Sequence, residues 1–135
     1  MIPVMLLDVR KEHAVADMCA SPGSKTIQIL ERLHQNTVVS EGSHDKRGFL
    51  IANDLDEKRA FMLQHQARRA NSPGLVVTNN DAMHFQSIKI DHGRRSFKFD
   101  RVLCDVPCSG DGTLRKNGGL WYTYHPHFGH GNHTL

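Results

Sequence analysis

The chain has 135 residues and a formal net charge of +3 at pH 7; 39% of the residues are hydrophobic and 23% are charged. This length favours one domain, and no stretch approaches the ~20 apolar residues that would cross a membrane. Three cysteines without a CxxC pair exclude a disulfide framework and favour a reducing, intracellular compartment.

Short apolar segments alternate with amphipathic ones along the chain. Strands are expected at 14–18, 48–53, 75–78 and 99–106, helices at 25–33 and 57–70, and polar loops at 36–47 and 86–98. Strands separated by helices predict an α/β fold with a mostly parallel sheet. In such a sheet, ligands bind at the carboxyl ends of the strands.

Acidic residues follow all four expected strands. Asp17 follows the first strand, Asp54 the second, Asp81 the third and Asp105 the fourth. The first strand also leads into a turn, which comprises Cys19, Ala20, Ser21, Pro22, Gly23, Ser24 and Lys25. The convergence of these residues predicts a ligand site at one edge of the sheet.

The residues of this site each have a structural alternative. Gly23 would let backbone amides approach a ligand and Lys25 would add a positive charge, or a Pro-Gly turn simply starts a helix. Asp54 could accept hydrogen bonds from both hydroxyls of a ribose, or it could cap the next helix, for which Asp56 is equally placed. Asp81 could accept from an adenine amino group, or it only forms a turn.

The segment 105–112 (DVPCSGDG) brings an acid, a rigid proline and a thiol together at the end of a strand. The C5 atom of cytosine becomes nucleophilic when a thiolate adds to C6, so a thiol beside a methyl donor suits this chemistry. The alternative for Cys108 is a small buried residue in a turn. Cys104 is expected to lie in the core.

Three segments resemble the Sun-domain family of S-adenosylmethionine-dependent RNA 5-methylcytosine methyltransferases: 17–26 (DMCASPGSKT), 51–54 (IAND) and 100–113 (DRVLCDVPCSGDGT). The resemblance covers about residues 6–117 and is closest to the eukaryotic nuclear members that methylate tRNA. It implies a Rossmann-like core, S-adenosylmethionine as cofactor, and RNA, with tRNA expected, as partner. It implies no membrane and no DNA partner, and a nuclear or nucleolar location.

The resemblance also implies roles for individual residues. Cys19 to Lys25 would contact S-adenosylmethionine, Asp54 its ribose, Asp81 its adenine and Asp105 its methionine end. The attacking thiolate of the family looks to be a second cysteine, in a Thr-Cys-Ser motif after a fifth strand. Cys108 matches the cysteine that assists product release, and no cysteine follows it.

Because the second cysteine, which would attack cytosine, is missing from this sequence, there are alternatives to the prediction that the chain is an active enzyme. The chain alone is expected to be inactive, as a non-catalytic fragment that binds cofactor or a partner. A further alternative uses Cys108 itself as the nucleophile, as DNA cytosine-5 methyltransferases use a Pro-Cys motif.

The family pattern stops after Asn117. Residues 1–117 are therefore expected to form a partial methyltransferase domain, cut after its fourth strand, and 118–135 a poorly ordered His- and Gly-rich tail. No structural metal site is expected from the tail histidines His125, His127, His130 and His133. Several basic residues could touch RNA phosphates or simply form a solvated surface: Arg68, Arg69, Arg94, Arg95, Arg115 and Lys116.

Overall fold

The computed structural model describes residues 2–34 and 47–131. These residues divide into two compact units, Met1–Asp105 and Val106–Leu135. All but one residue of the loop expected at 36–47 lies outside the described residues, as does His133 of the tail.

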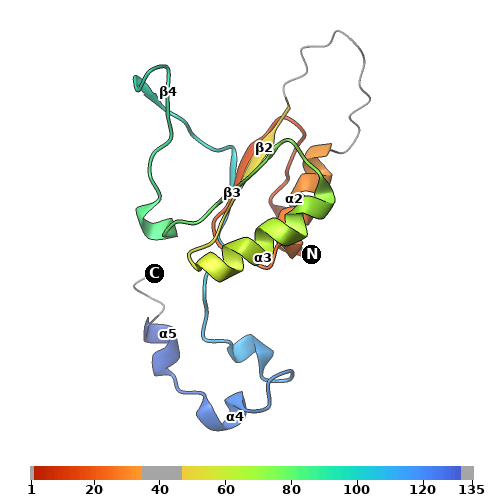
Figure 1. Cartoon of the computed structure of the whole chain (residues 1–135). Coiled ribbons are helices and arrows are strands. Elements are labelled where there is room, and N and C mark those ends of the chain that lie inside the picture. The colour runs from red at the N-terminus through yellow and green to blue at the C-terminus, as the bar shows by residue number, and fades with distance from the viewer. Residues whose placement is uncertain (1, 35–46, 132–135) are drawn as a thin grey trace. The chain divides into compact units, whose positions relative to one another are not determined.

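A four-stranded parallel sheet forms the centre of the first unit (Figure 1). Its strands are β1 (Ala14–Asp17), β2 (Phe49–Asn53), β3 (Leu75–Thr78) and β6 (Arg101–Leu103), in the order β3-β2-β1-β6. The chain moves outwards from β1 to β3 and then returns to the other side of β1. The predicted parallel α/β fold is confirmed, and the reversal beside β1 creates a switch point between β1 and β6.

Three helices pack on one face of this sheet: α1 (Ile2–Leu6), α2 (Ser24–His34) and α3 (Glu57–Ala67), the last continued by a short 3-10 turn, η1 (Arg68–Ala70). The parallel register points Val15, Leu50 and Leu103 to this face. They form one cluster with Val4 of α1 and with Ile29, Leu30 and Leu33 of α2. Leu63 of α3 packs on Ala52 of β2 in a second cluster. Burial of these apolar side chains is the main stabilising term.

The opposite face of the sheet is less well covered. The register places Ala16, Ile51, Val76 and Val102 on this face. The two central side chains are buried, whereas Val76 is 50% and Val102 48% exposed. The two edge strands therefore present apolar side chains to solvent on this face.

The fourth strand is shorter than predicted. It spans Arg101–Leu103 and not 99–106, because only these three residues pair with β1, the one strand beside it in the sheet. The prediction that Cys104 lies in the core is wrong, because Cys104 follows the end of the strand and is exposed.

The segment 86–98 was expected to be a loop, but it contains a two-stranded antiparallel hairpin of β4 (Lys89–Ile90) and β5 (Arg95–Ser96). Asp91, His92 and Gly93 form its turn with φ values of +53°, +56° and +86°. Strands of two residues are too short to show an alternating hydrophobic pattern, which is why the sequence did not predict them.

The second unit contains short helical segments: the 3-10 turn η3 (Asp111–Thr113), α4 (Leu120–Thr123) and α5 (His127–Gly131). The two α-helices differ from the expectation of little regular structure after Asn117. Each rests on local backbone hydrogen bonds, such as Tyr124 N to Leu120 O at 2.8 Å, which need no apolar periodicity. The side chains of Trp121 and Tyr122 are 70% and 92% exposed. The domain boundary at residue 117 stays a prediction.

The buried side chain of Asn53 joins the carboxyl ends of three strands. Its amide nitrogen donates to the carbonyl oxygens of Met18, at 3.2 Å, and Asn80, at 2.8 Å. Its oxygen accepts from Thr78 Oγ1 at 2.9 Å and from the Asn80 amide at 3.0 Å. All four hydrogen-bonding positions of this amide are used. Asn53 therefore fixes the ends of β1, β2 and β3 relative to one another.

We expect Asn53→Ala to lower the free energy of unfolding by about 2–4 kcal/mol, because several polar groups lose their partner in a buried place. Thr78→Val is the matched control, since it removes one of the four bonds and should cost about 1 kcal/mol. Urea unfolding of the chain measures both. Equal losses in the two variants would contradict this role of Asn53.

Candidate functional site

The parallel topology brings the four predicted acidic positions to one edge of the first unit. Asp17 ends β1, Asp54 directly follows β2, Asp81 follows β3 and Asp105 follows β6. This edge includes the switch point between β1 and β6, where ligands of open α/β sheets bind. The individual roles of these residues stay predictions.

The turn after β1 depends on a glycine. Gly23 has a φ of +108°, and a Cβ built on it would lie 3.0 Å from Leu63 Cδ1 of α3. The first helical hydrogen bond of α2 runs from Ile27 N to Gly23 O at 2.9 Å. The amides before Ile27 lie in the first turn of the helix, where the helix dipole favours an anion.

Asp54 is a structural centre of the site and only 4% exposed. Its Oδ2 accepts from the Ser21 amide at 3.0 Å and lies 3.4 Å from the guanidinium of Arg59. Its Oδ1 accepts from the Asp56 amide at 3.2 Å. The capping alternative for Asp54 is wrong, because Asp56 caps α3 by accepting from the Arg59 amide at 2.9 Å.

Arg59 is a site residue that the sequence did not reveal. Its guanidinium donates to the Ser21 carbonyl at 3.0 Å, and the Ser21 hydroxyl donates to the Arg59 carbonyl at 3.0 Å. These two bonds and the contact with Asp54 join the turn to the first turn of α3. Residues 38 positions apart carry no local pattern that would signal this contact.

Asp17 is fully buried beside an ion pair of Lys25 and Asp105. Its Oδ2 accepts from Thr26 Oγ1 at 2.9 Å, whereas its buried Oδ1 has no hydrogen-bond partner among the described residues. Burial raises the pKa of Asp17 to about 6, against the lowering effects of the Thr26 bond, the Lys25 charge and a contact with the Cys19 backbone amide. The site therefore holds a buried carboxylate oxygen without a well-formed hydrogen bond.

Asp81 makes only local contacts in the structure. It caps a short 3-10 turn, η2 (Ala82–His84), by accepting from the Met83 amide at 2.9 Å. Its other oxygen lies 2.8 Å from His84 Nδ1, and this hydrogen bond, with the Met83 amide, lowers the pKa of Asp81. The turn-forming alternative is thus present in the structure, while the adenine contact stays a prediction.

The cysteines differ in their surroundings. Cys19 is partly buried, and burial, followed by the charge of Asp54, raises its pKa, which disfavours a thiolate. Cys108 belongs to the second unit and is exposed, so the alternative of a buried turn residue is wrong.

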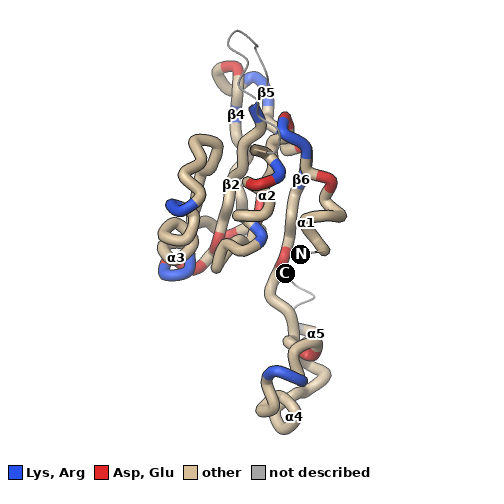
Figure 2. Tube along the Cα trace, turned by 90° about the vertical axis from the view of Figure 1, so that its right-hand side faces the viewer, with Lys and Arg blue, Asp and Glu red and all other residues tan. Residues whose placement is uncertain are grey.

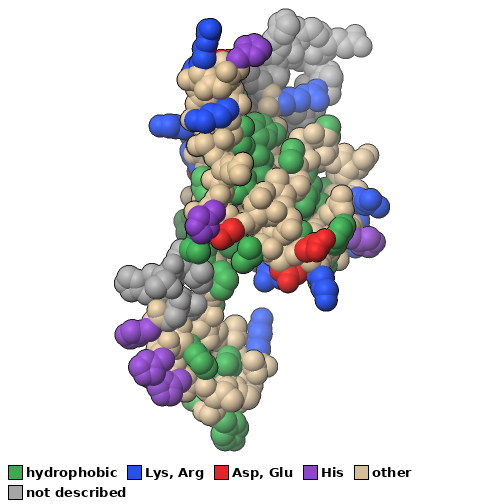
Figure 3. Space-filling view, turned by 60° about the vertical axis from the view of Figure 1, so that its left-hand side comes forward, with side chains coloured by type: hydrophobic (Ala, Val, Ile, Leu, Met, Phe, Trp, Pro, Cys, Tyr) green, Lys and Arg blue, Asp and Glu red, His purple; other side chains and the backbone are tan. Residues whose placement is uncertain are grey.

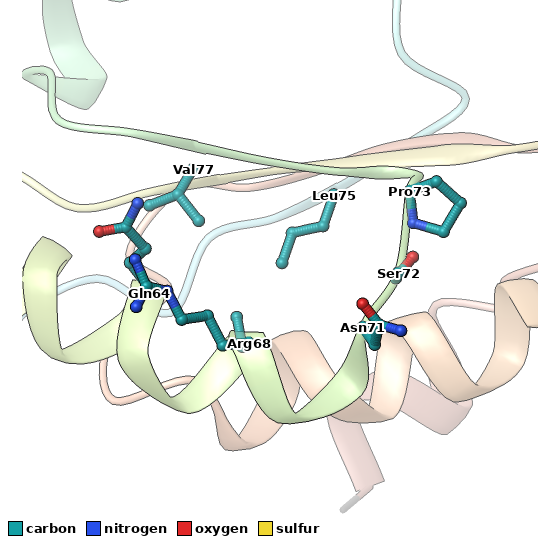
Figure 4. Close-up of a pocket in the computed structure, with 8 residues that line it drawn as sticks. Gln64, Arg68, Asn71, Ser72, Pro73, Leu75 and Val77 are labelled. Carbon is teal, nitrogen blue, oxygen red and sulfur yellow. The ribbon is translucent and has the colours of Figure 1, made fainter.

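A cavity of about 610 Å³ lies away from this edge, between α3 and β3. Leu75 and Val77 line its floor, with Gln64, Arg68 and Asn71 around it (Figure 4). It contains none of the residues predicted for the cofactor site. Over residues 2–34 and 47–131, no group of three or more potential metal ligands occurs, and no helix has the length and apolarity to cross a membrane.

A parallel sheet with a glycine turn after its first strand and acids at its carboxyl edge defines a Rossmann-like methyltransferase core. The crystal structure of PH0851 is similar to this chain, with a TM-score of 0.68 and 26% identity. The match covers 93% of this chain and 25% of the PH0851 chain. The NSun6 structure from Pyrococcus horikoshii with SFG shares the fold, with a TM-score of 0.58 and 22% identity over 81% of the chain and 24% of its own.

The chain belongs to the 16S rRNA methyltransferase RsmB/F family, whose model matches residues 4–126. The match continues past Asn117, so the expectation that the family pattern stops there is wrong. It is 47% identical over 140 residues to the multisite-specific tRNA:(cytosine-C(5))-methyltransferase of Saccharomyces cerevisiae, covering 100% of the chain and 19% of that protein. It is 52% identical over 124 residues to the tRNA (cytosine(34)-C(5))-methyltransferase of Drosophila melanogaster, an alignment that covers 90% of the chain and 16% of that protein. The chain thus spans less than a fifth of the length of these two relatives.

We expect Asp17→Asn to stabilise the chain without ligand near neutral pH. The pKa of Asp17 rises from 3.8 to about 6 on folding, so wild-type stability is lost as pH rises from about 4 through about 6. The loss should reach roughly 3 kcal/mol above that range. Asparagine carries no charge and can still accept from Thr26. Urea unfolding between pH 4 and pH 8 measures the difference, and parallel curves for the two proteins would contradict it.

Proposed function

We propose that this chain is the cofactor-binding part of an RNA cytosine-5 methyltransferase that uses S-adenosylmethionine, with tRNA as substrate. The observation that carries this proposal is the buried, unpartnered Oδ1 of Asp17, which lies at the switch point beside the Gly23 turn and the Lys25–Asp105 ion pair. Family membership and the names of the tRNA-modifying relatives support the same reaction.

The residues at the sheet edge fit the functional groups of S-adenosylmethionine. The cofactor has an ammonium, a carboxylate, a ribose diol and an adenine amino group, so it needs both acceptors and donors. Asp17 and Asp105 are suited to the ammonium end, and the start of α2 with Lys25 to the carboxylate. Asp54 Oδ1 accepts a hydrogen bond from the Asp56 amide and keeps a lone pair for a ribose hydroxyl, and Asp81 is suited to the adenine amino group.

When bound, the cofactor supplies an electrophilic methyl group on a sulfonium. The residues of this chain would bind and orient it: the turn from Cys19 to Lys25 along its length, with Asp54 held in place by Ser21 and Arg59. Cys108 would assist release of the methylated base, by family likeness. Residues 1–117 would form the partial methyltransferase domain, in a protein located in the nucleus or nucleolus.

The cysteine count favours a second candidate for the chain by itself, a fragment that binds cofactor without catalysis. The sequence contains no cysteine after Cys108, whereas the resemblance assigns the attack on cytosine C6 to a later cysteine. Cytosine C5 is unreactive towards a methyl donor until that attack occurs, so cofactor binding and methyl transfer are separable properties.

We expect Asp54→Ala to weaken binding of S-adenosylmethionine by about 5- to 100-fold, the equivalent of losing hydrogen bonds worth roughly 1–3 kcal/mol. Asp56→Ala is the control, because it removes a carboxylate two residues away that caps α3. Isothermal titration calorimetry of the purified chain measures both. Unchanged affinity in Asp54→Ala would rule out this placement of the cofactor.

We expect the chain alone to transfer no methyl group from labelled S-adenosylmethionine to unmodified tRNA. Removal of a covalent nucleophile commonly costs several orders of magnitude in rate. Cys108→Ser is the informative companion variant. Turnover that disappears in this variant would instead identify Cys108 as the nucleophile.

A further inference from the structure

The β4–β5 hairpin concentrates positive charge in ten residues. Between positions 89 and 98, Lys89, Arg94, Arg95 and Lys98 face a single acid, Asp91, which leaves a net charge of +3. The whole chain has the same net charge, so its other residues nearly balance. All five charged side chains are exposed. Lysine and arginine positions are coloured along this hairpin in Figure 2, and basic side chains gather around it in the space-filling view of Figure 3.

The hairpin presents these charges from a defined backbone. The pairing of β4 and β5 is extended by a hydrogen bond from Phe97 N to Ile88 O at 2.8 Å. Lys89 lies on one face and donates to Ser96 Oγ at 3.0 Å, and Arg95 lies on the other face. The ion pair of Arg95 with Asp91 spans 3.5 Å between exposed side chains, so it contributes little and leaves the surface basic.

An aromatic cluster anchors the hairpin to the amino end of the sheet. The ring of Phe97 lies 5.5 Å from that of Phe49 and 5.3 Å from that of Phe99, between ring centroids. Phe49 is the first residue of β2, whereas the cofactor site lies beyond its last residue. A strand of this length spans about 15 Å. An RNA must therefore extend well beyond its target nucleotide to reach the hairpin.

The chemistry of the hairpin favours phosphates over bases. The aromatic residues at its end, Phe97 and the following Phe99, are partly buried and packed against Phe49, so they do not offer stacking platforms. Exposed arginines and lysines bind the phosphate backbone without reading the sequence. We propose that the β4–β5 hairpin, through Arg94, Arg95 and Lys98, contacts the phosphate backbone of the RNA substrate at a distance from the reacting base. This inference rests on the proposed function.

The chain offers a matched pair of variants for the test. Arg94→Gln with Arg95→Gln removes two adjacent arginines from the hairpin. Arg68→Gln with Arg69→Gln removes two adjacent, exposed arginines from η1, so it changes the net charge equally. Fluorescence anisotropy would measure binding of the whole chain to labelled, unmodified tRNA and to a single-stranded oligonucleotide of about six nucleotides, without cofactor. Thermal melting checks that both variants fold.

We expect the hairpin variant to bind tRNA about tenfold more weakly at low salt, with a salt dependence reduced by roughly two phosphate contacts. The η1 variant and the short oligonucleotide should show little change. The proposal would be overturned if both variants weakened tRNA binding equally, if the hairpin variant weakened binding of both RNAs equally, or if the wild-type chain did not bind tRNA. Heparin serves as a polyanion without bases, and an equal weakening of heparin binding by the hairpin variant would also overturn the proposal. Calorimetry with S-adenosylmethionine separates this inference from the proposed function. The hairpin variant should keep the wild-type affinity for the cofactor. If the proposed function is wrong, neither the wild-type chain nor the two variants should bind the cofactor.

Discussion

The carboxylate of Asp54 accepts a hydrogen bond from the amide of Ser21, and this contact joins the end of β2 to the turn after β1. Arg59 extends it to α3 by binding both residues. Gly23 completes the arrangement, because its φ of +108° disfavours any other residue and a Cβ there would lie 3.0 Å from Leu63 Cδ1 of α3. The turn that is proposed to hold the cofactor is therefore shaped by a strand end and a helix from other parts of the chain, and its geometry cannot be separated from the fold.

At the same edge of the sheet, the negative charge of the carboxylates is only partly compensated, which suits a ligand with a cationic group. Asp17 is buried with one unpartnered oxygen, and its raised pKa shows that the charged form is disfavoured there. Lys25 lies close enough to lower that pKa but is paired with Asp105. A cationic group placed between the two carboxylates would relieve this imbalance, and the ammonium of the proposed cofactor is such a group. The energetic cost of burying Asp17 would then be offset on binding.

The two ends of the sheet differ in charge and in the function we propose for them. Acids lie at the carboxyl edge, where the cofactor is proposed to bind, whereas the basic hairpin is anchored near the amino end through Phe97 and Phe49. This separation keeps the cations of the hairpin away from the acids at the carboxyl edge.

The sequence by itself determined the parallel α/β class, the order of the four parallel strands with the helices α2 and α3, and the acids at the strand ends, because apolar runs and the turn residues that follow them are local signals. Short motifs in the expected order also indicated the resemblance to a known methyltransferase family. Only the tertiary structure decided which oxygen of Asp17 lacks a partner, that Asp56 and not Asp54 caps α3, and that Arg59 and Asn53 organise the site. It also decided the length of β6 and the exposure of Cys104, because only Arg101 to Leu103 pair with β1 and Cys104 follows the last paired residue. These features depend on contacts between residues that are distant in the chain, and such contacts leave no periodic trace in a single sequence.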